Sequence, residues 1–239
     1  MNFLEVIFGD GRWLYLWHGL EVTLVLTVLS LLLGTAIGVI IALLRTSNIR
    51  PFRRLKSKKP GDWRHKLSQF NPLAALGKLY VDLIRGTPLL VQLLIMYYVV
   101  FGSYQFMPKL FVAAIAFGVN SGAYIAEIIR GGINSIDSGQ MEAARSLGLS
   151  RWQAMRLVIL PQALKNSLPS LISEFIALLK ETSVVGWIGL NDIMRGADNI
   201  RFQTATAFQS LFAAALMYLI LTAIFTRVMA RVERRLKDD

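Results

Sequence analysis

Long apolar runs alternate with basic stretches along this chain of 239 residues. A helix needs about 20 apolar residues to cross the roughly 30 Å hydrocarbon core of a bilayer. Five runs approach or exceed that length: Val22–Leu44, Pro88–Phe106, Leu110–Ile129, Leu168–Val185 and Ala205–Thr226. The fourth run is the poorest, because it contains three charged residues. The pattern predicts an all-α membrane protein with five transmembrane helices.

The basic residues predict how these helices are oriented. The net charge is +11, and 21 of the 26 Lys and Arg residues fall into three blocks, 45–85, 130–165 and 227–239. Loops rich in Lys and Arg remain in the cytoplasm. Five spans place all three blocks on that side, with the N-terminus outside and the C-terminus inside. The same clustering argues against a nucleic-acid binder, which needs its basic charge on one soluble face.

Composition agrees with a membrane protein and narrows its chemistry. Hydrophobic residues make up 54% of the chain and charged residues 17%, against about 25% charged in soluble domains. There is no cysteine, and His18 and His65 lie far apart, so we expect neither a disulfide nor a metal site. Glu5 and Asp10 stand where a signal peptide would carry basic residues, so we expect the first span to be retained. The basic loop 45–85 is expected to lie near anionic lipid headgroups.

Local signals divide the chain further. Thr87 is expected to cap the second span, with Pro88 at its first helical position. Gly34 and Gly38 form a G-x-x-x-G face that lets helices approach closely, either within the chain or between two subunits. Gly186 and Gly189 predict a break after the fourth span, before an outer segment at 191–201.

A polar segment at 137–161 interrupts the apolar pattern within the second basic block. Two pairs of residues have the spacing of a capping box, Asp137 with Gln140 and Ser150 with Gln153. Gly148 is placed to end the first of the two helices that follow, and Pro161 is expected to break or kink the second. Spacing alone leaves two interpretations open, an amphipathic helix lying on the membrane and a docking element for another protein.

The stretch "EAARSLGLSRWQAMRLVILP" resembles the EAA loop of ABC importer permeases, with the pattern E-A-A-x₃-G-x₉-I/V-x-L-P. The residues that match are Glu142, Ala143, Ala144, Gly148 and Pro161. Three further stretches, "RGTPLLVQLL", "AYIAEIIRGGI" and "SEFIALLKETSVV", resemble the polar amino acid uptake branch, the histidine/glutamine/arginine permease family. The resemblance extends over about residues 14–236.

This resemblance implies the transmembrane domain of a type I ABC importer in the bacterial cytoplasmic (inner) membrane. It implies three protein partners: a cytosolic ATP-binding subunit, an extracytoplasmic solute-binding protein, and a second permease subunit of the same or a related chain. Segment 137–161 would be the coupling helix, with Glu142 pairing with a basic group of the ATPase and Ala143 and Ala144 allowing tight seating. The sequence contains no GxxxxGK[ST] motif, so we expect a non-catalytic subunit without cofactors, with ATP and Mg on the partner.

Polar and ionisable residues within the spans are the candidates for a substrate pathway. An ionisable side chain in a span costs about 2.5–3.5 kcal/mol and usually faces a partner or a water-filled path. The candidates are Asn120, Ser121, Tyr124, Glu127, Glu174, Lys180 and Glu181. Together they offer acceptors for an ammonium and donors for a carboxylate, as a polar amino acid requires. Glu127 could instead pair with Arg130 at the inner interface, and Lys180 could pair with a glutamate across helices.

Two other functional classes remain open from the residues alone. A membrane-integral enzyme could use Glu127, Glu174 and Glu181 as acid–base groups, although no nucleophile–base motif accompanies them. A stand-alone channel or secondary transporter would leave the polar segment 137–161 unexplained.

Overall fold

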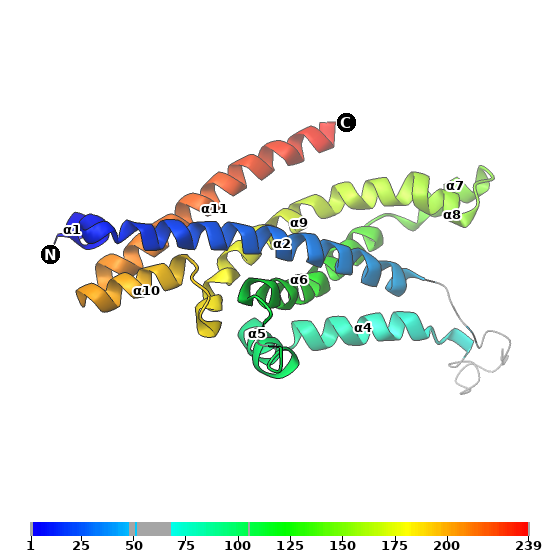
Figure 1. The fold of residues 1–239 in the computed structure, drawn as a ribbon. Coiled ribbons are helices and arrows are strands. Elements are labelled where there is room, and N and C mark those ends of the chain that lie inside the picture. Colours follow the sequence, from blue (N-terminus) through cyan, green and yellow to red (C-terminus); the bar gives the residue numbers. More distant parts are fainter. Residues whose placement is uncertain (1, 48–50, 52–67, 105, 239) are drawn as a thin grey trace.

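The computed structural model describes residues 2–47, 51, 68–104 and 106–238, and all regular structure in these ranges is helical (Figure 1). Of the predicted basic loop 45–85, residues 48–50 and 52–67 lie outside the described residues, and its last part, Pro72–Arg85, is helical. The elements are α1 (Phe3–Phe8), η1 (Gly9–Gly11), α2 (Trp13–Thr46), α4 (Pro72–Arg85), α5 (Leu89–Ile95), η3 (Met96–Val100), α6 (Lys109–Asn134), α7 (Ser138–Ser146), α8 (Arg151–Ala154), η4 (Met155–Ile159), α9 (Leu160–Glu181), η5 (Thr182–Ile188), α10 (Ile193–Thr204) and α11 (Ala207–Asp238).

Helices α2 and α6 make the most extensive contact among the described helices, and small residues on each let the two backbones approach. A Cβ added to Gly38 would lie 2.6 Å from Ile125 Cγ2, and one added to Gly122 would lie 2.8 Å from Ile37 Cγ2. Gly34 likewise lies against Ser121. The G-x-x-x-G face therefore packs within the chain, the first of the two alternatives that the sequence allowed.

Adding one methyl group at this contact is expected to destabilise the protein. The Gly38→Ala variant should lose about 1–3 kcal/mol, because Ile125 leaves no room for the new Cβ. Gly131→Ala is the matched control, since a Cβ there meets nothing within 4 Å and alanine favours a helix by about 1 kcal/mol. Thermal unfolding in detergent, followed by circular dichroism, measures both variants. Equal midpoints for the two would contradict this packing.

Three helices, α2, α6 and α11, are long and apolar enough to cross a membrane. They cover the first, third and fifth predicted runs. Helix α4 together with α5–η3 passes the same test as one broken span, bent by 103°. Of the described helices α9 is not among these candidates, in keeping with the charged residues it carries. Length and composition thus give three spans, or four with the bent pair.

The predicted span at 88–106 is helical only in part, and the cap assigned to its start was wrong. The helix that begins at Leu89 ends at Val100. It is preceded across the bend by α4. Pro88 itself occupies the N-cap position, with ψ 137°. The Thr87 hydroxyl donates instead to the Leu83 carbonyl of α4, 3.0 Å away. Proline disfavours helical geometry in the residue before it, so Thr87 belongs to the break rather than to α5.

Segment 137–161 folds as two helices around a glycine turn, as its punctuation predicted. Gly148 has φ +89°, and Ser150 and Gln153 form a reciprocal capping box with bonds of 2.8 and 3.2 Å. Asp137 caps α7 by accepting a hydrogen bond from the Gly139 amide at 2.7 Å. The capping box predicted between Asp137 and Gln140 is therefore not what caps this helix.

Of the break or kink predicted at Pro161, the break does not occur. The π-helical turn η4 carries the chain from α8 into α9, and Pro161 stands in the first turn of α9. Proline lacks the amide that would bond four residues back, and the chain adapts by widening this turn. The side-chain amide of Gln162 supplies a donor to the Val158 carbonyl, 2.8 Å away.

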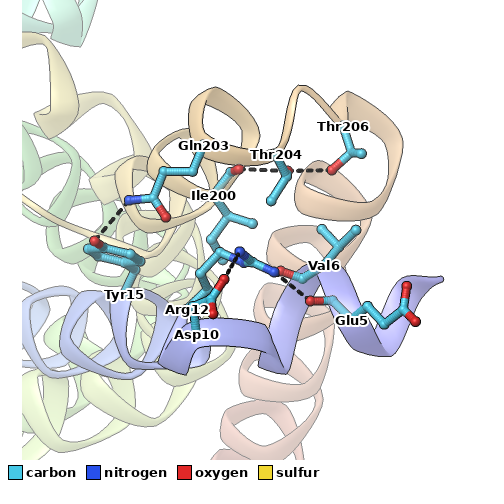
Figure 2. A network of polar contacts seen from close by, with 9 residues as sticks. All are labelled: Glu5, Val6, Asp10, Arg12, Tyr15, Ile200, Gln203, Thr204 and Thr206. Atoms are coloured by element: carbon cyan, nitrogen blue, oxygen red, sulfur yellow. Dashed lines mark hydrogen bonds and ion pairs between the residues drawn. The ribbon is translucent and has the colours of Figure 1, made fainter. Parts of the chain in front are cut away.

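The N-terminal residues pack against α10 and α11 through apolar side chains, and a buried arginine stabilises the turn within this segment (Figure 2). Arg12 donates from Nε to the Val6 carbonyl at 2.8 Å and from Nη2 to the Glu5 carbonyl at 2.6 Å. Its Nη1 pairs with Asp10, 2.9 Å away. Gln203 of α10 donates to the Tyr15 hydroxyl at 2.9 Å, which ties α10 to the start of α2.

Candidate functional site

Side-chain amides form hydrogen bonds that stabilise the break between α4 and α5. Gln92 Nε2 donates to the Ile84 carbonyl at 2.7 Å and to the Thr87 hydroxyl at 2.8 Å. Its Oε1 accepts from Asn120 Nδ2 of α6 at 2.9 Å. Backbone released from a broken helix needs such partners inside a membrane. Asn120, a predicted pathway residue, is therefore buried next to the break and bonded to it.

Glu174 of α9 lies next to Ser121 of α6, so two of the predicted pathway residues come together. The Ser121 hydroxyl donates to Glu174 Oε1 at 3.0 Å. Glu174 is partly buried and lines a hollow of about 410 Å³ on α9 together with Pro169, Ser170, Ser173 and Ala177. No ion pair between described residues involves Glu174. This carboxylate is thus positioned to accept a cation.

A guanidinium lies on the same face of α6. Arg85, the last residue of α4, stands over the Tyr124 ring with 5.1 Å between its Cζ and the ring centroid. Ser121 and Tyr124 are three residues apart and so are neighbours on the helix surface. One face of α6 therefore contacts a carboxylate from α9 and a guanidinium from α4. The sequence candidates omitted Arg85, although its position directly before Gly86, Thr87 and Pro88 was a usable signal.

Glu127 does not join this group. Its carboxylate pairs with Arg45 at the end of α2, 2.5 Å away, and with Arg130 on its own helix, whose Nε lies 3.1 Å from both carboxylate oxygens. The pairing with Arg130 that the sequence left open is present, and Arg45 adds a second cation from 82 residues away. This cluster ties α2 to α6 close to the end of the bundle that carries α7 and α8, hereafter the α7–α8 end (Figure 1).

Lys180 and Glu181 lie at the far end of α9 and are both exposed. Consecutive residues of a helix do not face each other, and no ion pair between described residues joins them. The helix ends directly after them: η5 follows, and Gly189 takes φ +72° before α10 begins. The predicted break after the fourth run is therefore present.

The α7–α8 end presents an apolar surface flanked by charge. Leu147, Trp152 and Leu157 are 85%, 68% and 61% exposed. Glu142 and Ala143 are exposed as well, while Ala144 is buried within the segment's own packing. Ala144 is therefore not accessible at this surface, which exposes Glu142, Ala143 and the three apolar side chains. Exposed apolar groups gathered in this way are typical of interaction surfaces.

Comparison with known proteins identifies the family. Residues 67–238 match the family described as "binding-protein-dependent transport system inner membrane component". The chain belongs to this family. It is therefore a permease, the non-catalytic membrane subunit of a transport system whose ATPase is a separate subunit.

Similar permeases cover nearly the whole chain. The chain is 36% identical over 229 residues to the arginine transport system permease protein ArtQ of Bacillus subtilis (strain 168), covering 94% of each. It is 34% identical to the putative glutamine transport system permease protein GlnP of Rickettsia felis, covering 93% of each. The glutamate/aspartate import permease protein GltK of Escherichia coli O157:H7 is also 34% identical and covers 92% of this chain and 93% of its own.

Solved structures agree with this assignment. An amino acid ABC transporter crystallised with histidines contains a chain that superposes with a TM-score of 0.82 at 38% identity, covering 98% of this permease and 99% of that chain. The MetNI methionine ABC transporter gives a TM-score of 0.74 at 20% identity, covering 95% and 99%, and supports the fold alone. The fold is that of a type I ABC importer permease.

Proposed function

We propose that this permease moves polar amino acids into the cytoplasm as the transmembrane subunit of a type I ABC importer. Relatives named for arginine, glutamine and glutamate/aspartate support the substrate class. The observation that carries the proposal is the pair of opposite charges on one face of α6, Glu174 beside Ser121 and Arg85 beside Tyr124. Every amino acid has an ammonium and a carboxylate, which these two groups complement.

In this proposal Glu174 accepts the ammonium and Arg85 donates to the carboxylate of the solute. A planar guanidinium donates two parallel bonds to a carboxylate, which fixes the solute's orientation as well as its charge. Asn120 and Gln92 hold the break that positions Arg85. Transporters commonly place such sites where a helix is interrupted near the middle of the membrane. Glu127, Lys180 and Glu181 stand toward the two ends of this pathway.

The proposed topology has five spans, with the N-terminus outside and the C-terminus inside. The five spans are α2, the bent α4–α5 pair, α6, α9 and α11. Of these, α9 is the one that length and composition alone do not identify. The end of α2, the start of α4, and α7 with α8 all lie at one end of the bundle, and α11 runs toward that end (Figure 1). The basic block 130–165 thus lies at the α7–α8 end, together with Arg45 at the end of α2, which supports a cytoplasmic location for that end. Glu142 and the apolar surface around Trp152 then meet the ATPase, with ATP and Mg bound there and no cofactor in this chain.

Equilibrium binding to the purified permease–ATPase complex tests the substrate class. A labelled amino acid is bound in detergent and displaced by unlabelled compounds. We expect arginine, glutamine or glutamate to displace it, while a primary amine lacking the carboxylate and a carboxylic acid lacking the ammonium each bind at least tenfold more weakly. Displacement by either single-charge analogue as strongly as by the amino acid would contradict the two-charge site.

A further inference from the structure

The hollow at Glu174 offers more room than the ammonium of a solute needs. Its volume is about 410 Å³, and its other lining residues are Pro169, Ser170, Ser173 and Ala177. An α-helix turns by about 100° per residue, so Ser170 and Ala177 lie on the same face of α9 as Glu174. These side chains are small, and the space beside them can therefore hold the side chain of the solute.

A second carboxylate stands on this face, closer to the end of α9. Glu181 follows Glu174 by just under two helical turns, which places it about 10 Å further along the axis and on nearly the same line. Glu181 and Arg85 both lie close enough to Glu174 to act on its charge. Glu181 is exposed, and no ion pair between described residues involves it. The substrate site thus has two carboxylates that no lasting ion pair neutralises.

Lys180 does not cancel the charge of Glu181. Consecutive residues of a helix point about 100° apart, so Lys180 is turned away from the line that joins the two glutamates. No ion pair between described residues joins Lys180 to Glu181. Like charges that interact in this way disfavour each other, and a cation bound between them relieves the repulsion.

We propose that Glu181 recognises the side chain of the solute and selects cationic amino acids, such as arginine and lysine. This inference rests on the proposed function, in which Arg85 binds the carboxylate of the solute and Glu174 its ammonium. A cationic side chain carries its charge on a flexible stem. The stem lies beside Ala177, and the charge meets Glu181. A neutral side chain leaves the repulsion between the two glutamates in place, and an acidic side chain adds to it.

Competition between arginine and citrulline tests this assignment. Citrulline has nearly the shape of arginine but no charge on its side chain. The wild-type permease–ATPase complex in detergent should bind arginine at least about tenfold more tightly than citrulline, because bonds to a charged group are the stronger ones. Glutamate should bind more weakly than either. In the Glu181→Gln variant the preference for arginine should disappear, while citrulline binds as it does to the wild type.

Three further variants show whether the effect belongs to Glu181. Glu21→Gln, the same substitution at an exposed position of α2, is the matched control and should keep the wild-type preference. Glu181→Asp retains the carboxylate and should retain part of the preference. Glu174→Gln should instead weaken arginine and citrulline alike, because both carry the ammonium that it binds. Basal ATPase activity of each complex measures folding independently of the solute.

The outcomes separate this inference from the proposed function. Equal affinity of the wild type for arginine and citrulline overturns the role of Glu181, even if both bind as amino acids. An unchanged preference in Glu181→Gln also overturns it, as does a preference that is lost only in Lys180→Met. A primary amine without a carboxylate that binds as tightly as arginine contradicts the proposed function itself.

Discussion

Reversing the charge of Glu142 is expected to stop uptake while leaving the permease folded in the membrane. Glu142 is exposed on α7, in the same segment as the exposed Leu147 and Trp152, and no ion pair between described residues involves it. In the proposed assembly it pairs with a basic group of the ATPase. Glu142→Lys replaces that pair by repulsion and should cost at least about 2 kcal/mol of docking energy, or roughly 30-fold in affinity.

Two measurements check this result together: co-purification of the ATPase subunit with the permease, and uptake by vesicles containing both. Gln140→Lys, which adds a charge at another exposed position of α7, is the control and should transport normally. Glu142→Gln should be intermediate, because it removes attraction without adding repulsion. Normal ATPase docking and uptake by Glu142→Lys would remove this residue from the coupling surface.

The Glu174→Gln variant is expected to bind amino acids at least tenfold more weakly. Hydrogen bonds to charged groups contribute about 1.5–3 kcal/mol, and glutamine keeps the shape of the side chain without its charge. Ser121 can still donate to the amide oxygen, so the contact between α6 and α9 is preserved. Asp82→Asn, the same kind of charge loss at an exposed position of α4, is the matched control and should bind normally.

Substrate analogues show which charge each side chain recognises. Glu174→Gln should lose the preference for an amino acid over the corresponding acid without its ammonium. Arg85→Gln should instead lose the preference over the corresponding amine without its carboxylate. If both variants keep the wild-type preferences, neither residue contacts the solute, and both belong to the packing of α4, α6 and α9.

The parts of the structure that follow from local pattern could be predicted from the sequence. The turn at Gly148 has a positive φ, which glycine adopts readily, so the residue type alone indicates it. The Ser150–Gln153 capping box involves two residues three positions apart, so their spacing in the sequence indicates it. Long apolar runs likewise predicted α2, α6 and α11. The stretch beginning at Glu142 pointed to the family, which the comparisons confirm.

The parts that depend on distant residues could not be predicted in this way. The partner of Glu127 on α2, Arg45, lies 82 residues earlier, and no spacing rule relates the two. The bend before α5 could not be predicted because the apolar run at 88–106 already has the length of a full span. Nothing in that run indicates that α4, upstream of it, belongs to the same bent pair. Arg85 was overlooked for the same reason, since its value as a site residue depends on Tyr124 of another helix.

Uptake by reconstituted vesicles tests the central claim most directly. Vesicles containing the permease and its ATPase subunit are loaded with ATP and Mg, and labelled amino acid is added outside with the solute-binding protein. We predict accumulation against the concentration gradient that requires ATP and is absent in the Glu142→Lys variant. Equal uptake without ATP would contradict the account and indicate a channel or a secondary transporter.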